Sequence, residues 1–429
     1  MVIIGSCDDG FSQKFEELLG RGAMDMEEVS SIVGGIIKEI RSEGDEALLR
    51  HIGKFDGWSP SCGDDLKVDT SDMKRAYDEL EADLKSALHL AYDRIKAYHE
   101  KQLPKSWIDF DKEGNILGQK VTPVERAGLY IPGGKAAYPS SLLMNAIPAI
   151  VAGVEEIVVT TPAPENRINH LLLAAAHLCG IKKMFKVGGA SAIAAMAYGT
   201  QSVPKVDVIT GPGNIFVATA KKMVYGDVNI DMIAGPSEIG IVADETAIPE
   251  YLAIDLLSQA EHDEMASSIL ITPSRELAEA VRETVYLELG KLERELIARK
   301  SIEERGAIIV TQNLDEAVEL MNRIAPEHLE VVTANPFELL PKIKHAGAVF
   351  LGEFTPEPIG DYMAGPNHTL PTGGTARFYS PLSTENFIKK SSIIAMSEGG
   401  INAIGEACAL LAKTEGLTAH EKSVRIRLG

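Results

Sequence analysis

The sequence predicts an α/β protein made of two tandem Rossmann-like, doubly wound units, with a helical section before them and a small tail after them. From about residue 121, short runs rich in β-branched residues alternate with alanine-rich helical segments, which is typical of parallel βαβ units. Glycine or proline follows many of these runs. Two such series follow each other along the chain, so two parallel sheets are the simplest account.

The N-terminal section, residues 1–120, is predicted to be mainly helical and to pack with the second α/β unit. Ile36 and Ile40 belong to a set of isoleucines at helical spacing. The region Leu80–Tyr98 repeats that period, which indicates further amphipathic helix.

The first Rossmann-like unit is predicted over residues 121–237. Its predicted strands are Ala127–Ile131, Glu156–Thr160, Lys183–Val187 and Val206–Thr210. Its predicted helices are Ser140–Val154, Ile168–Leu178, Ala190–Tyr198 and Asn214–Val224. Right-handed crossovers wind such elements into one doubly wound sheet.

The second Rossmann-like unit is predicted over residues 238–380. Its predicted strands are Glu238–Val242, Ser268–Thr272, Ala307–Thr311, Glu330–Thr333 and Ala348–Leu351. Its predicted helices are Glu250–Glu261, Arg275–Arg299 and Leu314–Ile324. The tail, residues 381–429, contains a helical segment at Ile401–Lys413. Because so short a segment is too small to form a core by itself, we expect the tail to dock elsewhere.

Composition and charge exclude several classes of function. The chain has 429 residues, with 42 Lys and Arg against 62 Asp and Glu, and a formal net charge of −20. A nucleic-acid binder needs basic side chains to neutralise phosphates, so we expect a small-molecule ligand and no nucleic acid. With 45% hydrophobic and 24% charged residues, the composition is that of a globular protein of about three structural units.

The sequence shows no predicted targeting or membrane segment. The longest apolar stretch, Leu142–Val154, contains Asn145 and Pro148 and is too short to span a bilayer. The N-terminus lacks a basic region followed by an apolar core, so we expect a cytoplasmic protein. The four cysteines are widely spaced, with no CxxC, and we expect reduced, mostly buried thiols.

Glycine-rich turns follow predicted strands of the first unit. They are Ile131-Pro132-Gly133-Gly134-Lys135, Val187-Gly188-Gly189-Ala190 and Thr210-Gly211-Pro212-Gly213-Asn214. Such turns let backbone N–H groups and a helix N-terminus approach a phosphate. None is a GxGxxG and no GxxxxGK[ST] occurs, so each turn alone is explained as a tight βα connection. Together, at the carboxyl ends of one sheet, they favour a nucleotide site.

Candidate metal ligands occur in three segments. Gln259 and His262 stand three residues apart at a predicted helix end, where both could reach one ion. Asp361 and His368 share a Gly/Pro-rich loop, a position where polar residues are often functional, and His420 lies in the tail. Such N and O donors suit Zn2+. A solvated polar patch is the alternative, which these residues alone leave open.

Glu327 and His328 are the candidate acid/base pair, at the start of an apolar strand. Imidazole can take a proton from an alcohol near neutral pH, and a carboxylate can activate water. A solvated turn between helix and strand explains the pair equally well.

These segments, in this order, resemble the histidinol dehydrogenase family over nearly the whole chain. The resemblance lies in ordered motifs: Gly128-Leu129-Tyr130-Ile131-Pro132-Gly133-Gly134, Gly211-Pro212-Gly213-Asn214, Ala234-Gly235-Pro236-Ser237-Glu238, Gln259-Ala260-Glu261-His262-Asp263, Ala325-Pro326-Glu327-His328-Leu329, Gly360-Asp361-Tyr362, Asn367-His368-Thr369-Leu370-Pro371-Thr372 and Leu417-Thr418-Ala419-His420. It implies a zinc-dependent, NAD-linked homodimer with one Zn2+ per subunit. The implied reaction is the four-electron oxidation of L-histidinol to L-histidine through bound L-histidinaldehyde, the last step of histidine biosynthesis.

The resemblance also implies roles for individual residues. The implied metal ligands are Gln259, His262, Asp361 and His420, and the implied acid/base pair is Glu327 and His328. The implied substrate contacts are Ser237, His368 and Glu415, together with His328 and the ligands. The implied NAD contacts are Tyr130, Ser191 and Asn214. In the family the tail crosses to the other subunit, so Glu415 and His420 are expected to complete the partner's site.

One position departs from the family, and two other functions stay open. Where the family often has a glutamine that contacts NAD, this chain has Ser191, which puts cofactor affinity in question. A dehydrogenase of the same fold that oxidises another primary alcohol, such as sulfopropanediol, would have the same acid/base pair and metal ligands. A catalytically silent ligand-binding protein on this scaffold is the alternative from another class.

Overall fold

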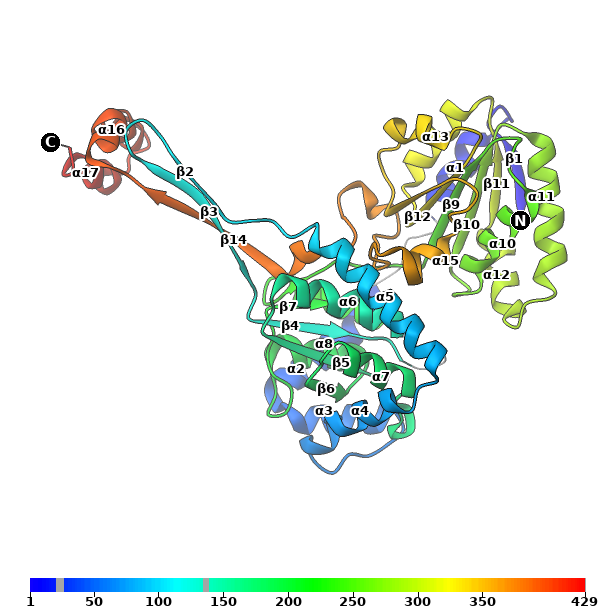
Figure 1. Cartoon of the computed structure of the whole chain (residues 1–429), viewed down its shortest axis with the longest axis horizontal. Helices are drawn as coiled ribbons and strands as arrows, with labels where there is room; N and C mark the ends of the chain where they lie inside the picture. The colour runs from blue at the N-terminus through cyan, green and yellow to red at the C-terminus, as the bar shows by residue number, and fades with distance from the viewer. Residues whose placement is uncertain (21–26, 134–138, 429) are drawn as a thin grey trace. The chain divides into compact units, whose positions relative to one another are not determined.

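The computed structural model describes residues 1–20, 27–133 and 139–428, so Gly134 and Lys135 of the first glycine-rich turn lie outside the described residues (Figure 1). The chain divides into two compact units. The larger comprises Met1–Gln102 and Glu125–Phe387, and the smaller comprises Leu103–Val124 and Ile388–Gly429.

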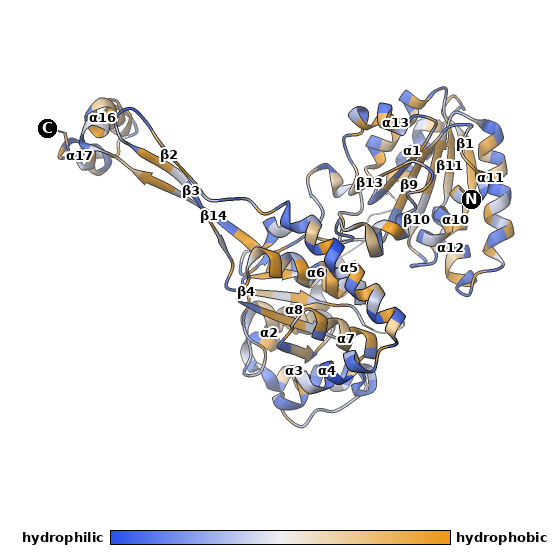
Figure 2. Cartoon of the chain, viewed as in Figure 1, coloured by the Kyte–Doolittle hydropathy of each residue, from blue (hydrophilic) through white to orange (hydrophobic). Residues whose placement is uncertain are grey.

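The first parallel sheet of the larger unit has the order β6-β5-β4-β7-β8. Its strands are β4 (Arg126–Tyr130), β5 (Glu156–Thr161), β6 (Lys183–Lys186), β7 (Val208–Thr210) and β8 (Asn229–Ile230). The crossover helices are α6 (Pro139–Ala152), α7 (His170–Leu178), α8 (Gly189–Tyr198) and α9 (Ile215–Val224). α6 and α8 are hydrophobic along most of their length (Figure 2), since helices that cover a parallel sheet are buried against it. The predicted doubly wound unit is confirmed.

The second parallel sheet has the order β1-β11-β10-β9-β12-β13. Its strands are β1 (Val2–Gly5), β9 (Glu238–Ala243), β10 (Ser267–Thr272), β11 (Ala307–Val310), β12 (His328–Val332) and β13 (Ala348–Leu351). Its helices are α10 (Pro249–Ala260), α11 (Arg275–Leu289), α12 (Glu295–Arg305) and α13 (Leu314–Ile324). The single helix predicted over Arg275–Arg299 is therefore wrong: Gly290 caps α11, and glycine is a poor residue for continuing a helix.

The N-terminal section packs differently from the prediction. Among the described residues of this section, β1 and α1 (Phe11–Leu19) join the second sheet, where Phe15 is fully buried. α2 (Glu27–Glu43) and α3 (Asp45–Phe55) instead place Ile40 and Leu48 in the core of the first sheet. α4 (Thr70–Asp78) packs on α7, whereas α5 (Ala82–Glu100) packs both on α6 and on residues Gly360–Ala364 of the second α/β unit. The predicted packing with the second α/β unit is therefore wrong for α2, α3 and α4, because helical periodicity shows which face is buried and not which partner buries it.

The smaller unit is an antiparallel sheet with two helices. Its sheet has the order β14-β3-β2, with β2 (Trp107–Phe110), β3 (Ile116–Pro123) and β14 (Ile388–Ala395). α16 (Glu398–Thr414) confirms the helix predicted in the tail, and α17 (Thr418–Arg425) follows it. The predicted boundary between residues 120 and 121 falls inside β3, because cross-strand pairing with β14 continues past it.

Short helical turns complete the described chain. They are η2 (Gly63–Leu66), η3 (Pro164–Asn166), α14 (Pro336–Leu339), η4 (Leu340–Lys342), α15 (Glu357–Ile359), η5 (Gly360–Ala364), η6 (Thr375–Arg377) and η7 (Thr384–Phe387). Within the described ranges, no helix is both long and apolar enough to cross a membrane. All four cysteines are described and unpaired, but Cys7, Cys62 and Cys408 are exposed and Cys179 alone of the four is buried. The expectation of mostly buried thiols is therefore wrong.

Candidate active site

The predicted acid/base pair and the helix-borne metal ligands meet at one end of the second sheet. β12 begins at His328 and pairs in register with β9, in which Ile239 lies opposite His328. Gln259 lies in the last turn of α10, the helix that leads back to the start of β10. Because parallel strands start at the same edge, these residues gather at the amino ends of the strands.

His328 is buried and held by two oxygen atoms. Its Nδ1 lies 3.1 Å from Gln259 Oε1 and 3.2 Å from the backbone oxygen of Glu238. Both atoms accept, so Nδ1 carries the proton in the neutral ring. The opposite atom, Nε2, lies 3.5 Å from Asp361 Oδ1. Among the described residues Nε2 makes no hydrogen bond, so in the neutral ring its lone pair is available to a substrate proton or a cation.

Buried carboxyl groups surround His328. Glu327 Oε2 accepts a hydrogen bond of 3.0 Å from the backbone N–H of Glu238 and lies 3.8 Å from His328 Nδ1. Burial raises the pKa of Glu327 to about 8 and the pKa of Glu357 to about 7. Burial acts to lower the pKa of His328, but Glu327, Glu357 and Asp361 together outweigh it and raise that pKa to about 10. Buried carboxylates are costly without a compensating positive charge. A divalent cation bound at this cluster would therefore stabilise their ionised forms.

Three of the predicted site residues, Gln259, His262 and His368, are neutral and lie beside the carboxyl groups around His328. Gln259 Nε2 donates to His262 Nδ1 over 3.0 Å. Burial lowers the pKa of both His262 and His368, so both imidazoles are neutral near pH 7, the form that ligates metals. Asp361 lies in the turn after α15, and a cavity of about 430 Å3 is lined by Asp361, His368 and Phe350, among others.

A group of three donors fits Zn2+, but Asp361 is the one member that it shares with the predicted ligands Gln259, His262, Asp361 and His420. Ligand atoms of His328, Glu357 and Asp361 all lie within 4.8 Å of one another, and N and O donors suit Zn2+. Sequence reasoning missed Glu357, which is one helical turn before Asp361. This i, i+4 spacing is the signal that could have revealed it.

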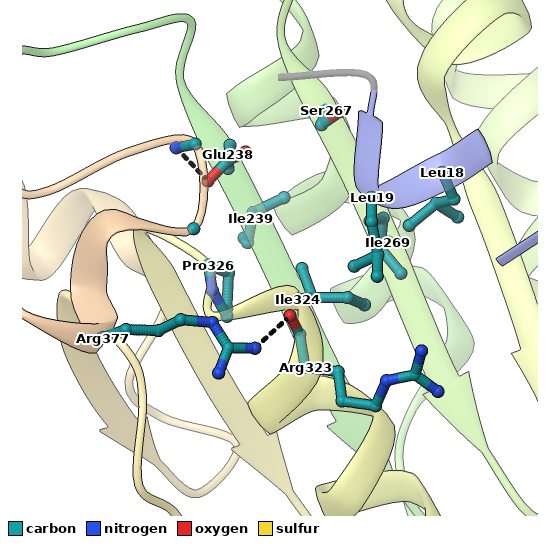
Figure 3. Close-up of a pocket in the computed structure, with 12 residues that line it drawn as sticks. Leu18, Leu19, Glu238, Ile239, Ser267, Ile269, Arg323, Ile324, Pro326 and Arg377 are labelled. Atoms are coloured by element: carbon teal, nitrogen blue, oxygen red, sulfur yellow. Dashed lines mark hydrogen bonds between the residues drawn. The ribbon is translucent and has the colours of Figure 1, made fainter. Parts of the chain in front are cut away.

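The turn between α13 and β12, which leads into the acid/base pair, is stabilised by a residue from a later part of the chain. α13 ends before Ala325, which adopts a left-handed φ of 52°. Arg377 donates to the carbonyl oxygen of Arg323 over 2.6 Å (Figure 3), and so caps the last turn of α13. Pro326 follows and lines a cavity of about 220 Å3 (Figure 3). The Glu327–His328 pair therefore follows a capped helix end and a conformationally rigid proline, which fix its position at the start of β12.

The predicted NAD contacts lie at the carboxyl ends of strands in the first sheet. Tyr130 ends β4, and its Oη accepts a 3.3 Å hydrogen bond from Gly189 N–H. Ser191 is buried in the first turn of α8. Asn214 caps α9, with Oδ1 accepting from the backbone N–H groups of Phe216 and Val217. The three residues flank glycine-rich turns and helix N-termini, which suit a phosphate-containing ligand.

A buried ion pair supports the turn after β7. The side chains of Lys221 and Asp231 are almost fully buried and paired. Lys221 Nζ donates to Gly211 O over 2.9 Å, and Gly211 N–H donates to Asp231 Oδ2 over 2.8 Å. Gly211 has a φ of +117°, and a Cβ there would lie 2.0 Å from Tyr130 O. Glycine is therefore required at this position, and sequence reasoning missed the ion pair that holds it.

The other predicted site residues lie in two places. Ser237 immediately precedes β9, and its backbone oxygen accepts from Ser267 N–H over 3.0 Å, next to the Glu238 contacts described above. Glu415 and His420 belong to the smaller unit, where both are exposed. Their part in the site stays a prediction.

Comparisons with known proteins identify the family. The family model for histidinol dehydrogenase matches residues 19–428. A curated histidinol dehydrogenase from Sulfurimonas denitrificans is 68% identical over 428 residues, covering 100% of both chains. One from Wolinella succinogenes is 69% identical over 418 residues, covering 97% of each chain. A crystal structure of histidinol dehydrogenase from Elizabethkingia anophelis matches with a TM-score of 0.94 and 37% identity, covering 100% of this chain and 98% of that chain. The chain is therefore an enzyme, a dehydrogenase that belongs to the histidinol dehydrogenase family.

Proposed function

We propose that this protein catalyses the zinc-dependent, NAD-linked oxidation of L-histidinol to L-histidine through bound L-histidinaldehyde, the last step of histidine biosynthesis. The observation that carries this proposal is the environment of His328: a buried imidazole with Nδ1 held by two acceptors and Nε2 facing Asp361. Membership of the histidinol dehydrogenase family supports the choice of substrate.

We assign the cofactors to separate groups of residues. Gln259, His262 and Asp361 would hold Zn2+ together with His420 of the partner subunit, in a homodimer that exchanges its tails. When bound, Zn2+ supplies a positive charge that offsets the buried carboxylates and positions the substrate. Tyr130, Ser191 and Asn214 would hold NAD, and two NAD molecules bound in turn would each accept the two electrons of one oxidation.

His328 acts as the base in both oxidations in its neutral form, which bound Zn2+ would favour by offsetting the carboxylates that raise the pKa of His328. Its Nε2 takes the proton of the substrate hydroxyl, while Gln259 Oε1 and the Glu238 carbonyl retain the proton on Nδ1. After that proton has been released to solvent, the same atom takes a proton from the hydrated aldehyde in the second oxidation. One fixed tautomer therefore serves both steps.

Glu327 acts between the two oxidations, when water adds to the aldehyde. Its carboxylate removes a proton from the attacking water. The pKa of about 8 that burial gives Glu327 lies near neutral pH, where a carboxyl group can accept that proton and release it again. His328 and Glu327 are only 3% and 7% exposed, so bulk water has little access to the bound aldehyde.

Counting NADH at 340 nm from purified protein and L-histidinol, before and after chelation, tests this proposal. We expect about two NADH per histidinol, as a four-electron oxidation by a two-electron acceptor requires, with activity lost on chelation and restored by Zn2+. Absence of turnover by metal-replete protein would exclude histidinol and direct the search to other primary alcohols, such as sulfopropanediol.

A further inference from the structure

A chain of hydrogen bonds reaches Ser191 from the protein surface, and the reaction steps above do not use it. His51 Nδ1 lies 2.9 Å from Ser191 Oγ, and His51 Nε2 lies 3.0 Å from Glu39 Oε2. His51 and Ser191 are buried, at 7% and 4% exposure, whereas the Glu39 side chain is 47% exposed. The three residues come from α3, α8 and α2. Two helices of the N-terminal section thus converge on the first turn of α8.

The carboxylate sets the direction of these hydrogen bonds. The hydrogen bond with His51 is the main cause that holds the pKa of Glu39 below its usual range, so Glu39 is ionised and only accepts. Because Glu39 only accepts, His51 Nε2 donates to it, and in the tautomer with that one ring proton Nδ1 accepts the Ser191 O–H. Ser191 Oγ has no proton left to donate. Toward any further partner it is an acceptor.

Tyr130 lies beside the same turn and has the opposite hydrogen-bonding role: it can donate to a further partner. Its Oη already accepts from Gly189 N–H, and burial raises its pKa to about 12, so the phenol keeps its proton. That proton is available for a further acceptor. Gly189 has a φ of +60°, and apart from its chain neighbours and the backbone of its own helix, no atom of the described residues lies within 4 Å of where a Cβ would stand. The space next to Gly189, between the hydroxyl groups of Tyr130 and Ser191, is therefore open to a ligand.

We propose that Glu39 and His51 are positioning residues that hold Ser191 as a hydrogen-bond acceptor for a ribose hydroxyl of the dinucleotide, with Tyr130 as the matching donor. A ribose hydroxyl both donates and accepts, whereas an ionised phosphate only accepts. The Glu39–His51–Ser191 relay takes the place of the longer glutamine that the family often has at this position. The proposal rests on the proposed function, because it presupposes that NAD binds here.

A double-mutant cycle on the full-length protein tests the relay. The equilibrium Kd for NAD and the steady-state KM and kcat with L-histidinol are measured for Ser191→Ala, Glu39→Ala and the double variant. We expect each single variant to raise the Kd for NAD about fivefold, the effect of one hydrogen bond, with a larger change in KM for NAD than in kcat. The double variant should be no weaker than Ser191→Ala, because His51 then has no hydroxyl to orient.

Two further variants separate positioning from a merely structural role. Glu39→Gln keeps an oxygen that can accept from His51 without the charge, so it should restore a Kd for NAD near that of the wild type. His89→Ala is the matched control, since His89 is an exposed histidine whose contact with Tyr77 lies away from the relay. It should leave the Kd for NAD unchanged. Thermal melting shows whether each variant is folded.

The outcomes distinguish the relay from the proposed function. Additive effects of Ser191→Ala and Glu39→Ala, or an unchanged Kd for NAD in either, would overturn the relay. If those results accompany normal histidinol oxidation, the proposed function stands without it. Coupled effects on NAD binding without histidinol turnover would support the relay and exclude the substrate. A wild-type protein that does not bind NAD would overturn both.

Discussion

The two parallel sheets of the larger unit have the same local strand order but place their candidate sites at opposite ends. In both sheets the first strand of the series lies between its successor and a later strand, as in β6-β5-β4-β7-β8 and β11-β10-β9-β12-β13. The first sheet presents glycine-rich turns and helix N-termini at the carboxyl ends of its strands. The second presents charged side chains at the amino ends, where His328 starts β12.

The difference shows how one topology supports two kinds of ligand. Helix N-termini carry partial positive charge and free N–H groups, which suit an anionic dinucleotide. The amino ends of strands receive helix C-termini, with partial negative charge. Gln259 lies in the last turn of α10, so a cation placed there gains from the helix as well as from the carboxylates.

Removal of the His328 imidazole is expected to have the largest effect. It should impair catalysis at the second sheet without affecting NAD binding at the first. His328→Asn should lower kcat by about 10^3-fold, since it removes the base of both oxidations. The Kd for NAD should stay near the wild-type value because the cofactor residues belong to the other sheet. Steady-state NADH formation and equilibrium NAD binding measure the two effects. A comparable loss in His89→Asn, which changes an exposed histidine, would contradict the assignment.

Lys221→Met should destabilise the fold at the turn after β7 in the first sheet. Removing one member of a buried pair leaves Asp231 unpaired and is expected to lower the free energy of unfolding by about 3 kcal/mol. Urea denaturation measures this loss. Lys222→Met changes the exposed neighbour on the same helix and should change the free energy of unfolding by less than about 0.5 kcal/mol. Equal effects of the two substitutions would show that the buried pair does not stabilise the turn after β7.

Glu327→Gln should slow the second oxidation about 10^2-fold and the first much less, because only the second needs water to be activated. The NADH formed per histidinol should fall toward about one, as expected if aldehyde is released between the two oxidations. The control is Glu319→Gln, at an exposed position on α13. Equal slowing of both half-reactions, measured with histidinol and with the aldehyde, would count against this role.

Chelated protein should lose stability as pH rises, and this is the smallest expected effect. The pKa of Glu357 is raised by burial to about 7, and that of His328 is raised to about 10. Groups with raised pKa bind more protons in the folded state, so the free energy of unfolding falls as pH increases through this range. We expect a loss on the order of 2 kcal/mol between about pH 5 and pH 9, seen as a lower Tm. Zn2+ should reduce the loss, and a Tm of chelated protein that rises with pH would contradict the argument.

Much of the fold was predictable because its signals are local. The alternation of apolar runs and alanine-rich segments located β4 to β7 and β9 to β13 within a few residues. The strand β1 was missed, since four residues that extend the edge of a distant sheet resemble any short apolar run. The pairing of β14 with β3 was also missed, because it joins strands that lie far apart in the sequence.

The sequence by itself determined most strands of both sheets, the residue types of the site and the family. Only the tertiary structure decided which partners these residues have. It brought Glu357 beside His328, joined Lys221 to Asp231 across the turn after β7, and placed His51 against Ser191. The reason is physical: helix and strand periodicity are properties of neighbouring residues, whereas a buried hydrogen bond or ion pair depends on chain segments that meet only after the cores have formed.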